Sequence, residues 1–287
     1  FVLNDFGENF YFENDGNGVF EEAAVLVGLA YNAFGLENAS MGVDSGDIDN
    51  DGLIDFFMTC YQNEYTVHYR NNGGGNFEDI SQLSQAGPPA YAYVNWGANV
   101  VDYDNDADRD LFIANGHTED NIDKYDSSTA YRVPNMVLMN DGTGRFADVS
   151  GECGDGLKPV QSSRGSAWDD LDNDGDIDGV ILNAREAPTI LRNESKNSNH
   201  WLEIKVIGTH SSRDAIGATV RVTADGLTQV AERQSGRGYQ SHYGSVIHFG
   251  LGNAATIERI EVDWLNGKTQ VLDNLPADQT ITIVEQR

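Results

Sequence analysis

Short apolar runs alternate with polar, glycine-rich stretches along the first two thirds of the chain. Three of these runs, at residues 56–60, 111–115 and 180–183, directly follow clusters of aspartates. Runs this short, bounded by turn-forming residues, are typical of β-strands, because helices usually need about ten residues or more. The pattern therefore predicts a protein built mainly from short strands.

A repeating order of strands and turns surrounds each run. A strand containing Gly42, Gly97 or Gly165 precedes each aspartate cluster, and a second short strand follows the run. In two repeats this second strand ends in a glycine turn, at residues 71–77 and 140–146, which is a strong hairpin signal. The repeating unit is therefore strand, acidic loop, strand, strand, glycine turn, strand.

The length of the repeat indicates the architecture. The aspartate clusters begin at residues 47, 102 and 170, so the repeats span 55 and 68 residues, and a polar insertion at residues 116–132 enlarges the second. Four short strands per repeat at this period predict the blades of a β-propeller. Blades in one register would bring the three acidic loops to the same rim.

The N-terminus carries part of a further repeat. Residues 14–20 form another glycine turn, and residues 1–4 align with residues 111–115 and 180–183, so we expect the chain to begin just after a fourth acidic loop. Three blades and a fraction do not close a ring, since propellers contain about four to eight blades. We expect upstream residues or another chain to meet the open edges, and a homo-oligomer or fibre formed through these edges is one hypothesis.

The pattern changes from residue 201 onward. Short alternating segments joined by turns containing Gly, Asn and Asp predict a small antiparallel β-sandwich or barrel. The expected strands are residues 201–207, 217–223, 228–233, 245–249, 257–264, 269–272 and 280–285. The predicted fold class is all-β: a partial propeller of four-stranded blades over residues 1–198, followed by a β-sandwich domain over residues 199–287.

The charge of the chain supports this division and limits the partners. The 287 residues include 46 acidic and 18 basic side chains, which gives a formal net charge of −28. Residues 1–199 carry −26 of this charge and the remainder only −2. So acidic a protein is repelled by nucleic acid and by anionic membranes. The sequence also contains no run of eighteen apolar residues, so we expect no membrane span.

The aspartates recur in three nine-residue loops, residues 47–55, 102–110 and 170–178, with carboxylates at positions 1, 3, 5 and 9. Carboxylates so close repel one another by roughly a kcal/mol per pair in water, and more where water is excluded. A bound cation removes this repulsion. Calcium suits the loops because it accepts six to eight oxygens in a flexible shell, whereas magnesium prefers a small octahedral shell and keeps its waters. The alternative is a solvated acidic turn, which three copies in one register disfavour.

The loop positions suggest individual roles. Positions 1, 3 and 5 supply side-chain oxygens, position 7 a backbone carbonyl, and position 9 a closing carboxylate, for about three calcium ions in all. Glycine at position 6 permits the sharp turn, and Ala107 in the second loop predicts strain of about 1 kcal/mol and a weaker site. The expected ligands are Asp47, Asp49, Asp51, Leu53 and Asp55; Asp102, Asp104, Asp106, Asp108 and Asp110; and Asp170, Asp172, Asp174, Asp176 and Asp178.

Catalytic motifs are missing from the sequence. It contains neither Gly-x-Ser-x-Gly nor His-Glu-x-x-His, and no Gly-x-x-x-x-Gly-Lys phosphate loop. A non-enzymatic role is therefore favoured over a calcium-dependent hydrolase or lyase. A glycan-binding face that includes Tyr91, Tyr93 and Trp96 is a third reading, although these aromatics also suit a blade core. Cys60 and Cys153 form either a disulfide or two free thiols.

Motifs from both halves of the chain resemble a known family. The first two thirds resembles FG-GAP/VCBS repeats, the integrin-alpha-like propeller blades with calcium loops, and the tail resembles the ASPIC/UnbV domain of cartilage-acidic-protein-like proteins. The motifs are Asn115-Gly116-His117, Asn193 after Leu191-Arg192, Asn199-His200-Trp201-Leu202, Arg213-Asp214-Ala215-Ile216-Gly217-Ala218, Gly236 with Gly238-Tyr239, and His248-Phe249-Gly250-Leu251-Gly252.

The resemblance implies a secreted or cell-surface protein without established catalytic chemistry. Such a protein binds calcium and engages other macromolecules, here an extracellular protein, a glycan or copies of itself. The resemblance implies metal-ligand roles for residues of the three acidic loops only.

Overall fold

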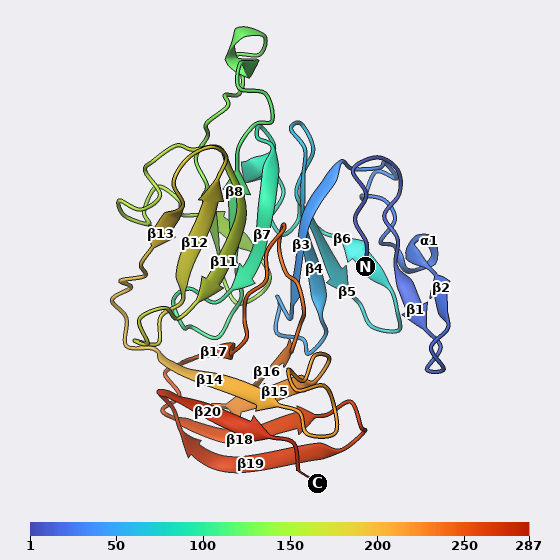
Figure 1. Ribbon diagram of the computed structural model, residues 1–287, viewed down its shortest axis with the longest axis vertical. Coiled ribbons are helices and arrows are strands. Elements are labelled where there is room, and N and C mark those ends of the chain that lie inside the picture. Colours follow the sequence, from blue (N-terminus) through green and yellow to red (C-terminus); the bar gives the residue numbers. More distant parts are fainter. Residues whose placement is uncertain (287) are drawn as a thin grey trace.

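A computed structural model describes residues 1–286 of the chain and shows a nearly all-β protein (Figure 1). The only helical pieces in this range are α1 (Ala24–Val27) and two short 3-10 turns, Pro88–Ala90 and Ile122–Lys124. No helix among these residues is long and apolar enough to cross a membrane. The all-β fold class predicted from the strand pattern is therefore confirmed.

The first two acidic repeats each fold into an antiparallel four-stranded sheet. The first blade has the order β3-β4-β5-β6, and the second blade has the order β7-β8-β9-β10. Each is a simple meander, as the repeating unit predicted. The first blade consists of β3 (Ser40–Gly46), β4 (Asp55–Cys60), β5 (Val67–Asn71) and β6 (Phe77–Asp79), and the second of β7 (Asn95–Val101), β8 (Asp110–Asn115), β9 (Met136–Asn140) and β10 (Phe146–Asp148).

The third blade departs from the expected four strands. It contains only β11 (Ser163–Asp169), β12 (Asp178–Asn183) and β13 (Thr189–Leu191), in that order. The physical reason is local: the residues after Asn193 lack the glycine turn that returns the chain in the first two blades, and they lead directly into the C-terminal strands. At the other end of the chain, β1 (Phe12–Asn14) and β2 (Phe20–Glu22) form an isolated hairpin around the N-terminal glycine turn.

The C-terminal strands form two small sheets, which lie below the blades in Figure 1. All seven expected strands are present, with shifts of up to four residues at their ends. One sheet has the order β17-β14-β20 and the other β16-β15-β18-β19. The strands are β14 (His200–Ile207), β15 (Thr219–Ala224), β16 (Leu227–Glu232), β17 (Ile247–Gly252), β18 (Thr256–Asp263), β19 (Thr269–Pro276) and β20 (Gln279–Val284).

The two sheets of this C-terminal sandwich enclose one apolar core, which includes Leu202, Val220, Phe249 and Ile260. The alternating burial along β15 matches the apolar and polar alternation in the sequence. One detail differs from the expected antiparallel pairing: β14 and β20 run parallel to each other. Parallel neighbours need a long crossover, and β15 to β19 supply it.

A long connection between β16 and β17, residues 233–246, rises between β3 and β7 (Figure 1). Within this inserted segment, Gly238 exchanges two backbone hydrogen bonds with Val43 of β3. The inserted segment explains why residue 165, in the strand before the third acidic loop, is a glycine. A Cβ at Gly165 would lie 2.8 Å from the carbonyl oxygen of Tyr239, so a larger residue there would clash with the inserted backbone. The inserted segment thereby fixes the sandwich against the blades.

Candidate metal centres

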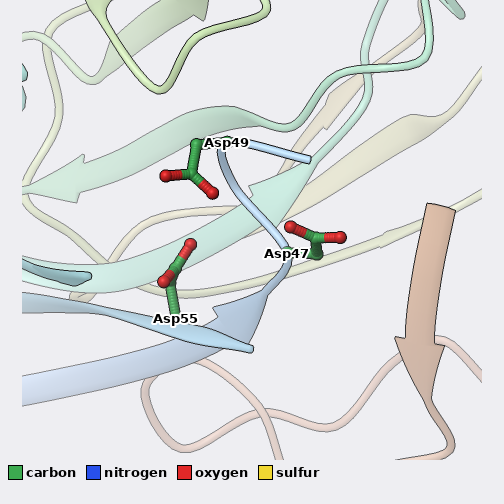
Figure 2. Close-up of side chains that lie close together, drawn as sticks. All are labelled: Asp47, Asp49 and Asp55. Atoms are coloured by element: carbon green, nitrogen blue, oxygen red, sulfur yellow. The ribbon is translucent and has the colours of Figure 1, made fainter. Parts of the chain in front are cut away.

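The first acidic loop brings three carboxylates to one point (Figure 2). Asp47 and Asp49 lie in the turn between β3 and β4, and Asp55 is the first residue of β4. One carboxylate oxygen from each lies within 4.8 Å of the others. Figure 2 shows the three side chains facing a common space, as ligands of a single cation would.

The same positions gather in the other two loops. Positions 1, 3 and 9 of the second loop are Asp102, Asp104 and Asp110, and those of the third are Asp170, Asp172 and Asp178. Each set meets the same distance limit of 4.8 Å. Three separated loops therefore build one arrangement, which a chance cluster of surface acids would not reproduce.

The carboxylates at position 5 are not part of these groups in the described structure. Instead, each accepts a hydrogen bond from the backbone N–H of position 7. The distances are 2.8 Å for Asp51 and 3.1 Å for both Asp106 and Asp174. A ligand role for positions 5 and 7 therefore remains a prediction.

The carboxylate at position 1 stabilises the turn of its own loop. One oxygen of Asp47 accepts the N–H of Gly52 at 3.0 Å, and Asp102 accepts the N–H of Ala107 at the same distance. Position 6 has a positive φ in every loop: 88° at Gly52, 81° at Ala107 and 93° at Gly175. Ala107 thus adopts the left-handed backbone that the sequence predicted to be strained.

The carboxylate at position 9 joins its loop to the neighbouring strand. Asp55 accepts the N–H of Ile48 at 3.1 Å and that of Asn71 at 2.7 Å. Asp110 and Asp178 bind the corresponding amides of their own blades, including Asn140 and Asn193 at 2.8 Å. The sequence motifs include Asn193 and the turns that Asn71 and Asn140 open, but they did not reveal that these residues bind the carboxylate at position 9.

Two of the three centres are buried and under-satisfied. One oxygen each of Asp47, Asp49, Asp102 and Asp104 is buried without a hydrogen-bond partner in the described part of the chain. A buried polar atom left without a partner costs about 1–3 kcal/mol, and more when it is charged. A cation at the centre would satisfy all four of these oxygens, so the residues present fit a bound metal.

Burial also favours the neutral form of these carboxyl groups when no cation is bound. Loss of solvent is the main cause that raises the pKa of Asp47 to about 6 and that of Asp55 to about 7. The same cause raises the pKa of Asp102 to about 7 and that of Asp110 well above its usual value. A divalent cation would reverse this effect by favouring the charged form.

The third centre is more open and already has a cationic neighbour. Nε of Arg192 lies 2.8 Å from Asp172, and Nη2 lies 3.7 Å from Asp174. Both aspartate side chains are more than a third exposed. The guanidinium therefore competes with any metal for this loop, a contact that the sequence pattern did not reveal.

Hydrogen bonds connect the three loops in order, as expected for loops on one rim. Asn50 at position 4 of the first loop donates to the carbonyl of Ala107 at 3.1 Å. Asn105, the equivalent residue of the second loop, donates to Gly175 at 3.1 Å and to Asp176 at 2.9 Å. Each loop therefore holds the next one in place.

Other residues considered from the sequence lie outside these centres. Trp96 is only 8% exposed and its Nε1–H donates to the carbonyl of Gly116 at 2.6 Å. It packs in the interior, while Tyr91 is 40% exposed, so the two do not present a shared glycan-binding face. Cys60 is buried and Cys153 is exposed, and both thiols are free.

Comparison with known proteins gives two family matches. The family described as ASPIC and UnbV matches residues 208–287, and the FG-GAP-like repeat matches residues 47–113. These matches confirm both resemblances inferred from the sequence motifs.

Full-length relatives extend the likeness to nearly the whole chain. Cartilage acidic protein 1 of Mus musculus is 27% identical over 274 residues, which cover 93% of this chain and 40% of that protein. Cartilage acidic protein 1 of Homo sapiens is 26% identical over 291 residues, covering 99% of this chain and 41% of that protein. The chain therefore spans about two fifths of the length of the curated relatives it matches.

Proposed function

Because the chain unites an FG-GAP-like repeat with an ASPIC and UnbV region and is homologous to cartilage acidic protein 1, we propose that it is a calcium-binding module of the extracellular matrix type. Its role is structural or adhesive and non-enzymatic. It engages other macromolecules, either an extracellular protein or glycan or copies of itself. Two observations support this assignment: the relatives are named cartilage acidic protein 1, and this chain has a formal net charge of −28.

The observation that carries the proposal is the repeated carboxylate triad with its unpartnered buried oxygens. In the first loop, Asp47 and Asp49 each direct one oxygen into a space without any donor, next to Asp55. Three carboxylates at one point destabilise the fold when no cation lies between them, because burial of each charge costs free energy. They are a suitable arrangement for a hard divalent cation.

The composition of the loops favours calcium over magnesium. The loops offer carboxylates and backbone carbonyls from nine consecutive residues, a geometry that is flexible rather than octahedral.

Calcium would strengthen the fold by mass action, because the ion binds the folded loop and not the extended chain. Each loop connects the first and second strands of its blade, β3 to β4 in the first case. The ions would therefore stiffen the rim along which the loops contact one another. We also propose that residues 1–198 form the calcium-binding part of the chain and residues 199–287 a second domain that packs against it.

Calcium binding is tested with protein stripped of metal by a chelator. Thermal unfolding is followed while calcium or magnesium is added, and the bound metal is counted by elemental analysis after gel filtration. We expect a calcium-selective rise in melting temperature and bound calcium in a ratio approaching one ion per loop. Equal responses to the two ions, or none, would contradict the assignment.

A matched pair of variants links the response to the triad. Asp47→Asn retains the size of the side chain but removes the charge of a buried ligand, so it should lower both the bound calcium and the melting shift. Asp5→Asn removes a charge from an exposed side chain that makes no hydrogen bond within residues 1–286, and it should leave both unchanged.

A further inference from the structure

The C-terminal sandwich packs directly on the second acidic loop, residues 102–110. The contact is made by β17, which lies on the side of the sandwich next to the blades (Figure 1). A Cβ added at Gly250 of this strand would overlap Oδ2 of Asp102 and lie 2.5 Å from Cα of Asn105. Any side chain larger than that of glycine would therefore push β17 away from a carboxylate of the second metal centre.

Hydrogen bonds hold the same strand against Asn105, which is position 4 of the loop. Nε2–H of His248 donates to Oδ1 of Asn105 at 2.6 Å, and the N–H of Gly252 donates to the Asn105 carbonyl at 2.8 Å. In the opposite direction, both Nη atoms of Arg109, position 8 of the loop, donate to the carbonyl of His248 at 3.3 Å. The loop and β17 are therefore joined at two separate points of the loop.

The connection that leads from the third blade into the sandwich binds the loop one residue earlier. The side-chain amides of Asn197 and Asn199 both donate to the backbone carbonyl of Asp104, at 2.6 and 2.9 Å. Asp104 is one of the three clustered carboxylates of the second centre. These two bonds therefore fix the backbone of a candidate ligand.

This covering buries the second loop more deeply than the first. Asn105 is 2% exposed and Ala107 is 8% exposed, whereas the equivalent Asn50 is half-buried and Gly52 is exposed. Asp102 is fully buried, and its Oδ1 has no hydrogen-bond partner in the described part of the chain. Removing water from a carboxylate oxygen without a donor costs free energy unless a cation binds it.

The sandwich and a cation would stabilise the same conformation of the loop. The carboxylates of Asp102, Asp104 and Asp110 have oxygens within 4.8 Å of one another, so without a cation their repulsion favours a wider loop. Widening the loop would displace Asp104 and Asn105, the two residues that the connection and β17 hold. Closure by the ion therefore favours docking of the sandwich, and docking favours the ion to the same extent.

We propose that the second metal centre is shared between the blades and the sandwich. Docking of β17 raises the calcium affinity of residues 102–110, and bound calcium in return keeps the sandwich on the blades. Gly250, His248 and Asn199 are positioning residues, since they act through the loop. The inference rests on the proposed calcium binding and adds that calcium links the two domains.

The first experiment measures the calcium affinity of the full chain by competition with a fluorescent chelator. Gly250→Ala should weaken the binding of one ion at least about fivefold, the lower end of the range for coupled sites, and leave the other ions unchanged. Gly151→Ala is the control, because an added Cβ there has open space around it in the described chain, and it should bind like the unaltered protein. In a chain that already carries Asp104→Asn, Gly250→Ala should cause no further loss.

A milder variant keeps the test valid if Gly250→Ala unfolds the sandwich. Asn197→Ala combined with Asn199→Ala removes only the two side-chain hydrogen bonds to the carbonyl of Asp104. It should weaken the binding of the same single ion. Circular dichroism and thermal melting of each variant, recorded with calcium present, establish that it is folded.

The second experiment measures the reverse effect by hydrogen exchange. The amide of Gly252 donates to Asn105 of the loop, so its exchange reports separation of β17 from the blades. Removing calcium with a chelator should speed exchange at Gly252 at least about fivefold, because coupling between two sites is reciprocal, while β18 within the sandwich stays protected. In Asp104→Asn, exchange at Gly252 should be fast with or without calcium.

Two results would overturn the inference and leave the proposed function intact. One is calcium binding by the unaltered chain that neither Gly250→Ala nor the double asparagine variant weakens. The other is an exchange rate at Gly252 that does not depend on calcium. If the unaltered chain binds no calcium, the proposed function fails and this inference fails with it.

Discussion

Arg237 forms a two-point ion pair with Asp44, a residue 193 positions earlier in the chain. Nε lies 2.8 Å from Oδ1 and Nη2 lies 3.0 Å from Oδ2. Arg237 belongs to the inserted segment and Asp44 to β3, so the pair joins the C-terminal sandwich to the first blade. The side chain of Asp44 is fully buried and also accepts hydrogen bonds from Tyr243 and from the N–H of Val100.

Replacing Arg237 by methionine should destabilise the chain by about 3–5 kcal/mol, because the charge of Asp44 would remain buried without its partner. Burial by itself would lower the pKa of Arg237, but Asp44 raises it above its usual value, so Arg237 stays protonated at all ordinary pH. Urea unfolding at neutral pH measures the loss. Arg213→Met serves as the control and should change the stability little, since Arg213 is exposed and forms no ion pair with the other described residues.

Removing both charges tests the pairing directly. The double variant Asp44→Asn with Arg237→Met should be more stable than the sum of the two single losses predicts, by about 1–3 kcal/mol, since neither charge is then left alone. Strictly additive losses would show that the two side chains act independently.

Ala107→Gly should stabilise the chain, because alanine at φ 81° is held in the left-handed region. The expected gain in free energy of unfolding is about 1 kcal/mol, reduced by the greater freedom of glycine in the unfolded chain. The same substitution should tighten calcium binding at the second loop, which calorimetric titration measures. Gly52→Ala is the reciprocal variant and should weaken the first loop.

Arg192→Ala should increase the calcium affinity of the third loop. The guanidinium lies 2.8 Å from Asp172 and must be displaced when an ion binds there. Arg185→Ala is the control, because Arg185 is also on the surface but pairs with Asp120, outside the acidic loops. Identical calcium titrations for the two variants would contradict the competition.

Glu285 makes the C-terminal sandwich sensitive to acid. Burial by itself would raise the pKa of Glu285, but hydrogen bonds from the N–H groups of Ser211, His210 and Thr209 outweigh it and lower the pKa to about 2. Because the folded pKa lies below the unfolded value of about 4.3, this contribution is complete above about pH 4.3. It is lost as the pH falls toward 2.

Glu285→Gln should therefore reduce the melting temperature most at neutral pH, and the difference from the unaltered chain should disappear toward pH 2. Melting curves recorded from pH 7 to about pH 2 test this. A difference that stays constant across this range would mean that the hydrogen bonds, and not the charge, account for the effect.

The sequence by itself determined the local parts of this protein. A nine-residue loop closed by a hydrogen bond from position 6 to position 1 brings its own aspartates together, so Asp47, Asp49 and Asp55 meet wherever the blade lies. The glycine turns and apolar runs likewise set the strands of the first two blades, because hairpin contacts join residues close in the chain.

The tertiary structure decided what depends on contacts between distant residues. It buried the first two acidic loops and left the third one open beside Arg192, which sets how strongly each loop needs a cation. It also made β14 and β20 parallel neighbours and inserted Arg237 beside Asp44. No periodicity encodes such pairs, because their geometry exists only once whole sheets have packed together.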